Sequence, residues 1–93
     1  MTRVLIRSTP FVRSAKRIIR KAAHSIIELK RVLQLLSEDP FHPMLRTHKL
    51  HGKLEGSWAC KLGHDLRIVF EFVEYEGTEA ILLHTVGTHE ELY

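Results

Sequence analysis

Histidine offers most of the acid–base chemistry available to this chain. The 93-residue sequence contains seven His, and five of them fall in its second half, at His48, His51, His64, His84 and His89. An unperturbed imidazole titrates near neutral pH, so it can accept and donate a proton during a reaction. These five residues are therefore the first candidates for a catalytic role.

Other groups capable of chemistry lie beside the last predicted strands. Asp65 and Arg67 flank the start of one strand, and Tyr93 follows His89 after the last strand. A carboxylate and a guanidinium near histidines can exchange protons and stabilise negative charge. Taken singly, each residue also has a structural explanation: Asp65 closes a turn, Arg67 pairs with an acidic neighbour, His89 caps the C-terminal turn, and Tyr93 packs on the core.

The sequence contains no motif that indicates metal binding, nucleotide binding or a reactive cysteine. His48 and His51 are three residues apart, and on a strand such residues point to opposite faces, so they do not chelate one ion together. The glycine loops GxxxxGK[S/T] and GxGxxG do not occur in the sequence. The single cysteine, Cys60, forms no internal disulfide, and we expect it to be a buried, unreactive thiol. We therefore expect neither a metal nor a cofactor.

The candidates depend on a few elements for their positions. A β-branched run predicts a strand over residues 2–7, and Thr9 and Pro10 predict the cap and first position of an amphipathic helix. A second helix starts near His24 and ends before Pro40. Alternating apolar residues then predict strands over 47–51, 57–62, 67–74 and 80–86, and Gly87 is expected to break the last one.

This order, β-α-α-β-β-β, indicates an α+β fold in which a helical hairpin packs on a small, mostly antiparallel sheet. In the strand over 67–74, alternation places Ile68, Phe70 and Phe72 on one face and Val69 and Val73 on the other. The length and the absence of a linker predict a single domain over residues 1–93.

Charge is distributed unevenly along the chain. Residues 1–32 hold nine basic residues and one acidic residue (+8), residues 33–62 hold four and three (+1), and residues 63–93 hold one and seven (−6), which sum to +3. The first predicted helix carries five of the basic residues, at Arg13, Lys16, Arg17, Arg20 and Lys21. This density indicates a polyanion or an acidic protein as partner, or simply a solvated helix face.

The sequence also favours one cellular location. Its apolar stretches are far shorter than a membrane span, and the N-terminal apolar run is too short for a signal peptide. We therefore expect a cytoplasmic protein.

Four motifs together resemble one family. They are His48-Lys49-Leu50-x-Gly52, Leu54-x-Gly56-x-Trp58, Asp65-Leu66-Arg67-Ile68-Val69-Phe70 and Gly87-Thr88-His89-x-x-Leu92-Tyr93. The sequence resembles the RelE/ParE superfamily of bacterial toxins from type II toxin–antitoxin pairs, and within it the YafQ-like mRNA interferases. The resemblance covers essentially the whole chain and implies a RelE-like fold.

The resemblance implies a metal-independent endoribonuclease that cleaves mRNA on the ribosome and is neutralised by a cognate antitoxin. RNA carries its own nucleophile, the 2′-OH, so the protein has only to move protons and stabilise charge on the phosphate. The implied partners are the antitoxin, the ribosome and mRNA, with no membrane involved.

The same resemblance suggests individual roles. His48 and Asp65 match acid–base positions, and His89 matches the histidine that transfers a proton to the leaving group. Tyr93 matches an aromatic position that orients a base or phosphate, and Arg67 is the candidate for stabilising phosphate charge. The RNA-binding candidates are Lys61, Lys49 and the five basic residues of the first helix. His51 and His64 are possible neighbours of this site.

Three positions depart from the YafQ-like pattern, and alternatives remain open. Lys61, Leu66 and Thr85 occupy places where the pattern has a histidine, a tryptophan and an arginine. One alternative is a ParE-like or inactive relative that binds a protein such as gyrase, and another is a nucleic-acid-binding module that regulates its own operon. His89 and Tyr93 favour the ribonuclease, because neither alternative needs an acid–base residue there.

Overall fold

The computed structural model describes residues 2–92, so Tyr93 lies outside the described part of the chain. Two 3₁₀ turns, η1 (Pro43–Leu45) and η2 (Gly52–Leu54), interrupt the loops around the second strand. The helices and strands, in chain order, are β1 (Val4–Arg7), α1 (Thr9–Lys21), α2 (Ser25–Glu38), β2 (His48–Lys49), β3 (Trp58–Leu62), β4 (Leu66–Tyr75), β5 (Thr78–Thr88) and α3 (His89–Leu92). Among these described residues, no helix is long and apolar enough to cross a membrane.

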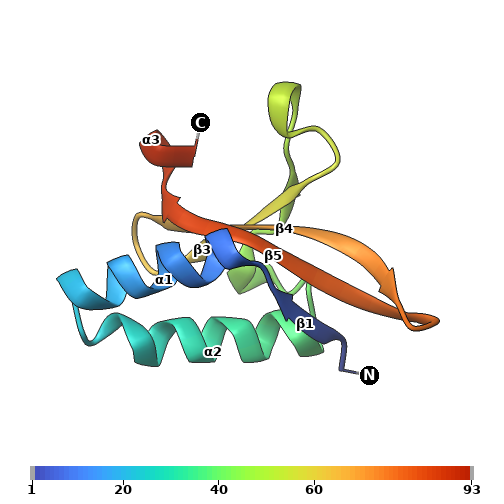
Figure 1. Ribbon diagram of the computed structural model, residues 1–93, viewed down its shortest axis with the longest axis horizontal. Coiled ribbons are helices and arrows are strands. Elements are labelled where there is room, and N and C mark those ends of the chain that lie inside the picture. The colour runs from blue at the N-terminus through green and yellow to red at the C-terminus, as the bar shows by residue number, and fades with distance from the viewer. Residues whose placement is uncertain (1, 93) are drawn as a thin grey trace.

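The strands form one sheet with the order β1-β5-β4-β3-β2. β1 runs parallel to β5, and the other neighbours are antiparallel. Helices α1 and α2 lie together on one side of the sheet, whereas α3 and the loop that contains η2 rise on the other (Figure 1). The α+β class and the helical hairpin on a mostly antiparallel sheet are therefore confirmed.

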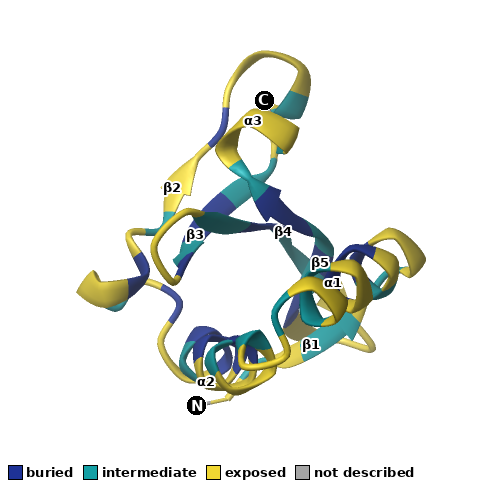
Figure 2. Cartoon of the chain, turned by 90° about the vertical axis from the view of Figure 1, so that its left-hand side faces the viewer, coloured by how far each residue is buried: buried dark blue, intermediate teal, exposed yellow. Residues whose placement is uncertain are grey.

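The main core lies between the helices and the sheet. The buried residues of both helices and of the central strands face a common interior (Figure 2). β4 supplies Ile68 and Phe70, which are fully buried, and Phe72 packs against them. Val69 points to the opposite face, where it packs with Ala59, Leu50 and flanking leucines in a much smaller cluster. The predicted division of β4 into two faces is confirmed at these positions.

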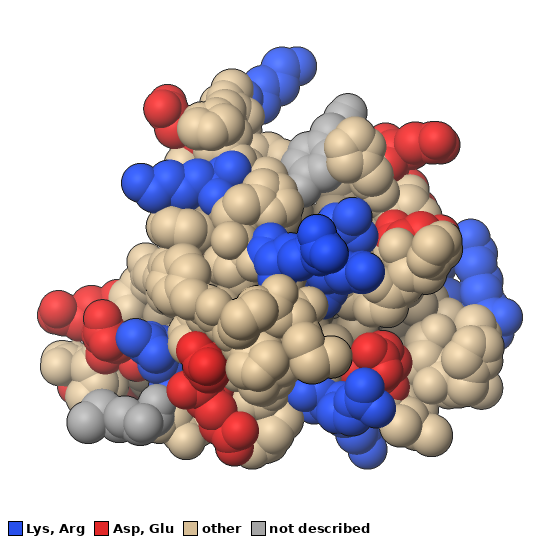
Figure 3. Space-filling model, turned by 180° about the vertical axis from the view of Figure 1, so that it is seen from behind, with Lys and Arg blue, Asp and Glu red and all other residues tan. Residues whose placement is uncertain are grey.

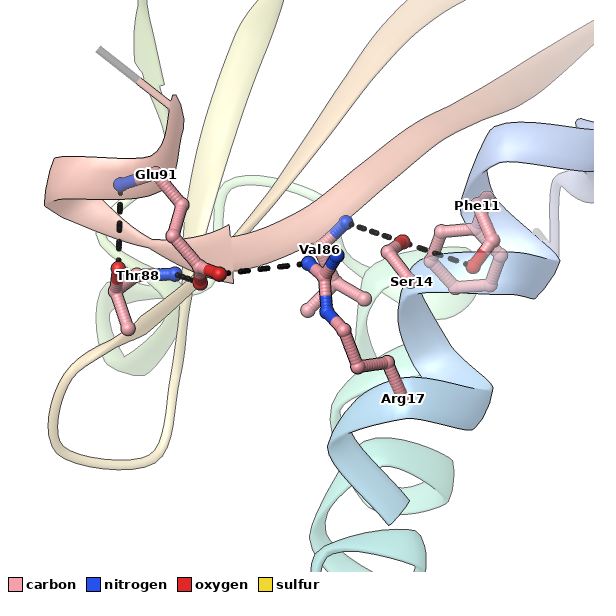
Figure 4. A network of polar contacts seen from close by, with 6 residues as sticks. All are labelled: Phe11, Ser14, Arg17, Val86, Thr88 and Glu91. Carbon is pink, nitrogen blue, oxygen red and sulfur yellow. Dashed lines mark hydrogen bonds and ion pairs between the residues drawn. The ribbon is translucent and has the colours of Figure 1, made fainter. Parts of the chain in front are cut away.

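Two serines attach α1 to β5. Ser8 Oγ accepts a hydrogen bond from the Phe11 N–H at 3.2 Å and donates one to the His84 carbonyl at 3.2 Å. Further along the helix, the buried Ser14 hydroxyl donates to the Phe11 carbonyl at 3.0 Å and accepts from the Val86 N–H at 3.0 Å (Figure 4). The expected helix cap, Thr9, is therefore wrong by one residue, because Ser8 both caps the helix and reaches the strand.

Two further expectations about the second half are corrected. The strand expected over 47–51 is present but is only the two-residue β2, which pairs with β3, so four strands follow the helices and the order β-α-α-β-β-β is one strand short. Gly87 does not break β5, which continues to Thr88 because Gly87 pairs with Arg67 of β4. The residues after it form the short helix α3, which folds back so closely that a Cβ on Gly87 would lie 3.1 Å from Glu91 Oε1. A larger side chain at position 87 would therefore crowd Glu91 of α3.

The one-sided core predicts how unequally two positions of α2 contribute to stability. Leu36 is fully buried and Ile27 is 69% exposed on the same helix. Leu36→Ala should lower the free energy of unfolding by about 2–5 kcal/mol, because it leaves a cavity in the core. Ile27→Ala, the matched control, should change it by no more than about 0.5 kcal/mol. Urea denaturation followed by circular dichroism measures both values, and equal losses would contradict this description of the core.

Candidate active site

A basic row crosses the sheet on the face away from α1 and α2. Lys61 of β3, Arg67 of β4 and Gly87 of β5 lie directly opposite one another in the strand register. They share the face of Ala59 and Val69, because residues two apart on a strand point the same way. Arg67 is half-buried, and its Nη1 donates to the Leu66 carbonyl at 2.9 Å. The row therefore places positive charge beside a buried glycine that α3 covers.

Asp65 and His89 lie beside this row, where β4 begins and β5 ends. Leu66 of β4 pairs with Thr88 of β5, Asp65 immediately precedes Leu66, and His89 immediately follows Thr88. The two exposed residues therefore mark the ends of neighbouring strands, one in the β3–β4 turn and the other at the start of α3. The register thus brings together a carboxylate and an imidazole that are 24 positions apart in the sequence.

His48 approaches the same face from the edge of the sheet. It lies opposite Ala59, which in turn pairs with Val69 in the row next to Arg67. His48 Nδ1 is 2.9 Å from the Arg46 carbonyl oxygen. Because a carbonyl only accepts, Nδ1 is the donor in this contact, and in the neutral imidazole the lone pair is then on Nε2. The contact therefore favours the tautomer that a general base acting through Nε2 needs.

A capping box fixes the helix that carries His89. The Glu91 N–H donates to Thr88 Oγ1 at 3.2 Å, and the Thr88 N–H donates to Glu91 Oε1 at 2.9 Å (Figure 4). Glu91 Oε2 also lies 3.5 Å from an Arg17 nitrogen of α1. The Thr88 hydrogen bonds, with smaller help from Arg17 and Lys21, hold the pKa of Glu91 below its ordinary value of 4.5. The pattern Thr-x-x-Glu signals such a box in a sequence, and it was not among the predicted features.

The other predicted RNA-binding residues are spread over several surfaces. Lys49 lies on the opposite face from His48, with its Nζ 5.5 Å from the centre of the Trp58 ring. All five basic residues of α1 are exposed, and one of them, Arg17, forms an ion pair with Glu91; the others are Arg13, Lys16, Arg20 and Lys21. Lysine and arginine side chains also gather near the middle of the face seen from behind (Figure 3). Basic charge is therefore not confined to α1.

The remaining candidates lie near the site or in the core. His64 is exposed in the turn beside Asp65, and His51 is exposed just before η2. Leu66 is half-buried in β4, and Thr85 lies opposite Val69 in the next row along the sheet. Cys60 is fully buried, and burial raises the pKa of its thiol to about 12, so it is unreactive in the folded protein. Within residues 2–92, no group of three or more His, Cys, Asp or Glu is arranged to hold a metal ion.

Comparison with protein families identifies the chain. Residues 3–93 match the family described as the bacterial toxin of type II toxin–antitoxin system, YafQ. The chain belongs to the YafQ family. It is accordingly a toxin of the type II toxin–antitoxin class, as the sequence motifs predicted. No curated protein matches it significantly by sequence.

Solved structures share the fold of this chain. YafQ from Escherichia coli strain BL21(DE3) superposes with a TM-score of 0.79 at 18% identity, covering 98% of each chain. In the E. coli DinJ–YafQ toxin–antitoxin complex the match has a TM-score of 0.77 at 18% identity, over 100% of this chain and 99% of the other. A metal-bound toxin from Helicobacter pylori has a TM-score of 0.72 at 26% identity, with 100% of each chain covered. The predicted RelE-like fold is confirmed.

The capping box predicts how α3 responds to acid. Because the pKa of Glu91 is lower in the folded protein than in the unfolded chain, the box stabilises α3 at neutral pH and is lost as the pH falls below 4.5. The amide signal of Thr88, followed by NMR, should titrate with a midpoint below 4.5. Thr88→Val should raise that midpoint, because it removes the hydroxyl from the box.

Glu90→Gln is the matched control, since it changes a neighbouring carboxylate of α3 that no hydrogen bond of the box involves. It should leave the Thr88 titration unchanged. A Thr88 midpoint at or above 4.5 would contradict the proposed cap.

Proposed function

We propose that this toxin is a ribosome-dependent endoribonuclease that cleaves mRNA without a metal ion. The observation that carries the proposal is the register of β3, β4 and β5, which sets Asp65 and His89 beside the Lys61–Arg67 pair on the open face of the sheet. Proton-transfer groups next to a fixed cation are what cleavage of a phosphodiester requires. The family membership supports the same conclusion.

The reaction follows from the chemistry of RNA. The ribose 2′-oxygen attacks the adjacent phosphorus, a 2′-O–P bond forms, the P–O5′ bond breaks, and a 2′,3′-cyclic phosphate remains. A base removes the 2′-OH proton, and an acid gives a proton to the departing 5′-oxygen. His48 Nε2 and Asp65 are the candidates for the base, and His89 is the candidate for the acid. Arg67, with Lys61 beside it, stabilises the charge that develops on the phosphate oxygens.

The basic surface of α1 supplies binding rather than chemistry. Arg13, Lys16, Arg20 and Lys21 are all exposed and are available to ribosomal RNA phosphates. An acidic segment of a cognate antitoxin fits the same surface. E. coli YafQ is seen in complex with DinJ, which supports a protein antitoxin for this chain as well. Antitoxin and ribosome would then compete for α1.

Substitution of His89 tests the enzymatic proposal. His89→Gln keeps a polar side chain but removes the proton donor, so cleavage should slow by about 10²–10⁴-fold, the usual contribution of a general acid. His24→Gln, an exposed histidine between α1 and α2, is the matched control and should cleave like the wild type. The assay maps mRNA 5′ ends on purified ribosomes and after induction in bacteria.

Measurement of growth arrest shows whether the ribonuclease proposal fails. If the wild type and His89→Gln stop growth equally and neither cuts mRNA, the protein acts by binding a target, as a ParE-like toxin would. In-frame cuts by the wild type alone support the ribonuclease.

The α1 surface generates a separate prediction. Changing Arg13, Lys16, Arg20 and Lys21 together to Gln should leave the fold intact and weaken ribosome binding. The slope of log affinity against log salt should become shallower by about 0.7–0.9 for each phosphate that the variant no longer neutralises. The control changes four exposed basic residues elsewhere, at Arg7, Lys30, Arg31 and Lys53. Equal losses in both variants would mean that net charge, and not α1, determines binding.

A further inference from the structure

A β-bulge alters the open face of the sheet beyond the basic row. Val69 of β4 lies opposite Thr85 of β5, but the next residue, Phe70, lies opposite Leu83, so His84 has no partner in the register. A bulge of this kind turns two successive side chains to the same side of the sheet. His84 and Thr85 therefore both project from the face that carries Arg67.

The bulge brings His84 to a carboxylate. His84 Nε2 and Glu71 Oε2 are 2.5 Å apart, and the two side chains remain about a third exposed. Each carboxylate oxygen has two lone-pair positions, so the His84 contact uses one position and leaves others on both oxygens. Glu71 can therefore accept further hydrogen bonds while His84 holds it in place.

A cavity of about 270 Å³ lies against this pair, on the same face as the candidate active site. Its apolar walls come from Val69 of the sheet, Leu92 of α3 and Leu54 of η2, and its polar lining comes from Glu71, His84, Thr85 and Ser57. Figure 1 shows that α3 and the loop containing η2 both rise from this side of the sheet. The cavity is thus bordered by the same helix that begins with His89.

The lining favours a flat, hydrogen-bonding ligand over an anion. Apolar side chains on two walls suit the faces of an aromatic ring, and a carboxylate repels phosphate but accepts N–H groups. Guanine presents two adjacent donors, N1–H and the N2 amino group, on its Watson–Crick edge. Adenine and cytosine each present one donor next to an acceptor there, and uracil presents one donor between two acceptors. A carboxylate with two accepting oxygens therefore selects guanine.

We propose that this cavity binds the guanine base of the nucleotide next to the cleaved phosphate, with Glu71 as the specificity residue and His84 as the residue that positions it. The inference rests on the proposed ribonuclease function, because it assumes that RNA lies on the open face. Glu71 follows Arg67 by four residues on one strand, a separation of about 13 Å. A nucleotide spans much of that distance from its phosphate to the far edge of its base, so the two contacts fit one RNA strand.

Binding of short RNA tests this cavity separately from catalysis. The probes are four 2′-O-methyl trinucleotides that differ only in one base, G, A, C or U, and that cannot be cleaved because the nucleophile is blocked. NMR signals of the Leu54, Val69 and Leu92 methyl groups report the site. The guanine probe should bind at least about fivefold more tightly than the others, the lower end of the discrimination that a two-bond base contact gives.

Variants assign the preference to Glu71. Glu71→Gln should abolish the guanine preference, because an amide offers one acceptor and one donor in place of two acceptors. His84→Gln should reduce it, because the carboxylate is then less firmly held. Glu74→Gln, an exposed carboxylate farther along β4 and outside the cavity, is the matched control and should keep the wild-type preference. Thermal unfolding of each variant checks that the fold is retained.

The outcomes separate the two proposals. Equal binding of all four probes, a preference that survives Glu71→Gln, or shifts confined to other surfaces would overturn the base site. A guanine preference that depends on Glu71, in a protein that cuts no ribosome-bound mRNA, would support the base site and refute the ribonuclease. Cleavage that ignores the base at this position, in the wild type and in Glu71→Gln alike, would refute the base site and leave the ribonuclease intact.

Discussion

The whole arrangement depends on alternation along β4. This central strand buries Ile68 and Phe70 against α1 and α2, and the same alternation sends Arg67, Val69 and Glu71 to the other side. Two helices cover only one face of the sheet, so the second face has just a small apolar cluster around Val69 and stays accessible. Shifting β4 by one residue would exchange the two sets, so packing of the core fixes the position of every polar group on the open face.

The open face separates kinds of charge by distance along the strands. The Lys61–Arg67 row is basic and lies next to Asp65 and His89, whereas Glu71 lies two rows away beside His84. A phosphate and a guanine base need opposite partners. The phosphate is an anion and needs a cation, whereas the base presents N–H donors and needs an acceptor. A single strand of RNA laid along β4 would therefore meet a cation at its backbone and a carboxylate at a base.

Much of the fold can be predicted from the sequence, and the predictions that were wrong have physical reasons. The helices, the longer strands and the two faces of β4 follow from local periodicity, which needs no knowledge of partners. Gly87 was expected to end β5 because glycine is unfavourable inside a strand. Its close contact with Glu91 could not be foreseen, since it exists only after α3 has folded back. The bulge at His84 depends on how β5 pairs with β4, and it leaves no local trace in composition.

The site residues divide in the same way. Family motifs drew attention to His48, Asp65, Arg67 and His89, and the register shows how residues distant in the sequence share one end of the sheet. Their chemical roles remain predictions. Lys49 could not be assigned to a face from its sequence alone, because β2 is only two residues long and its orientation depends on pairing with β3.

The serines that attach α1 to β5 have a consequence for solubility. β1 pairs with β5 only as far as Leu83, which would leave the rest of that strand with unpaired backbone groups at an edge. Ser8 and Ser14 instead satisfy the His84 carbonyl and the Val86 N–H, and α1 lies along the strand in place of another β-strand. An uncovered edge would be a template on which a second chain could extend the sheet. The two hydroxyl groups thus make α1 a barrier against edge-to-edge aggregation along this part of β5.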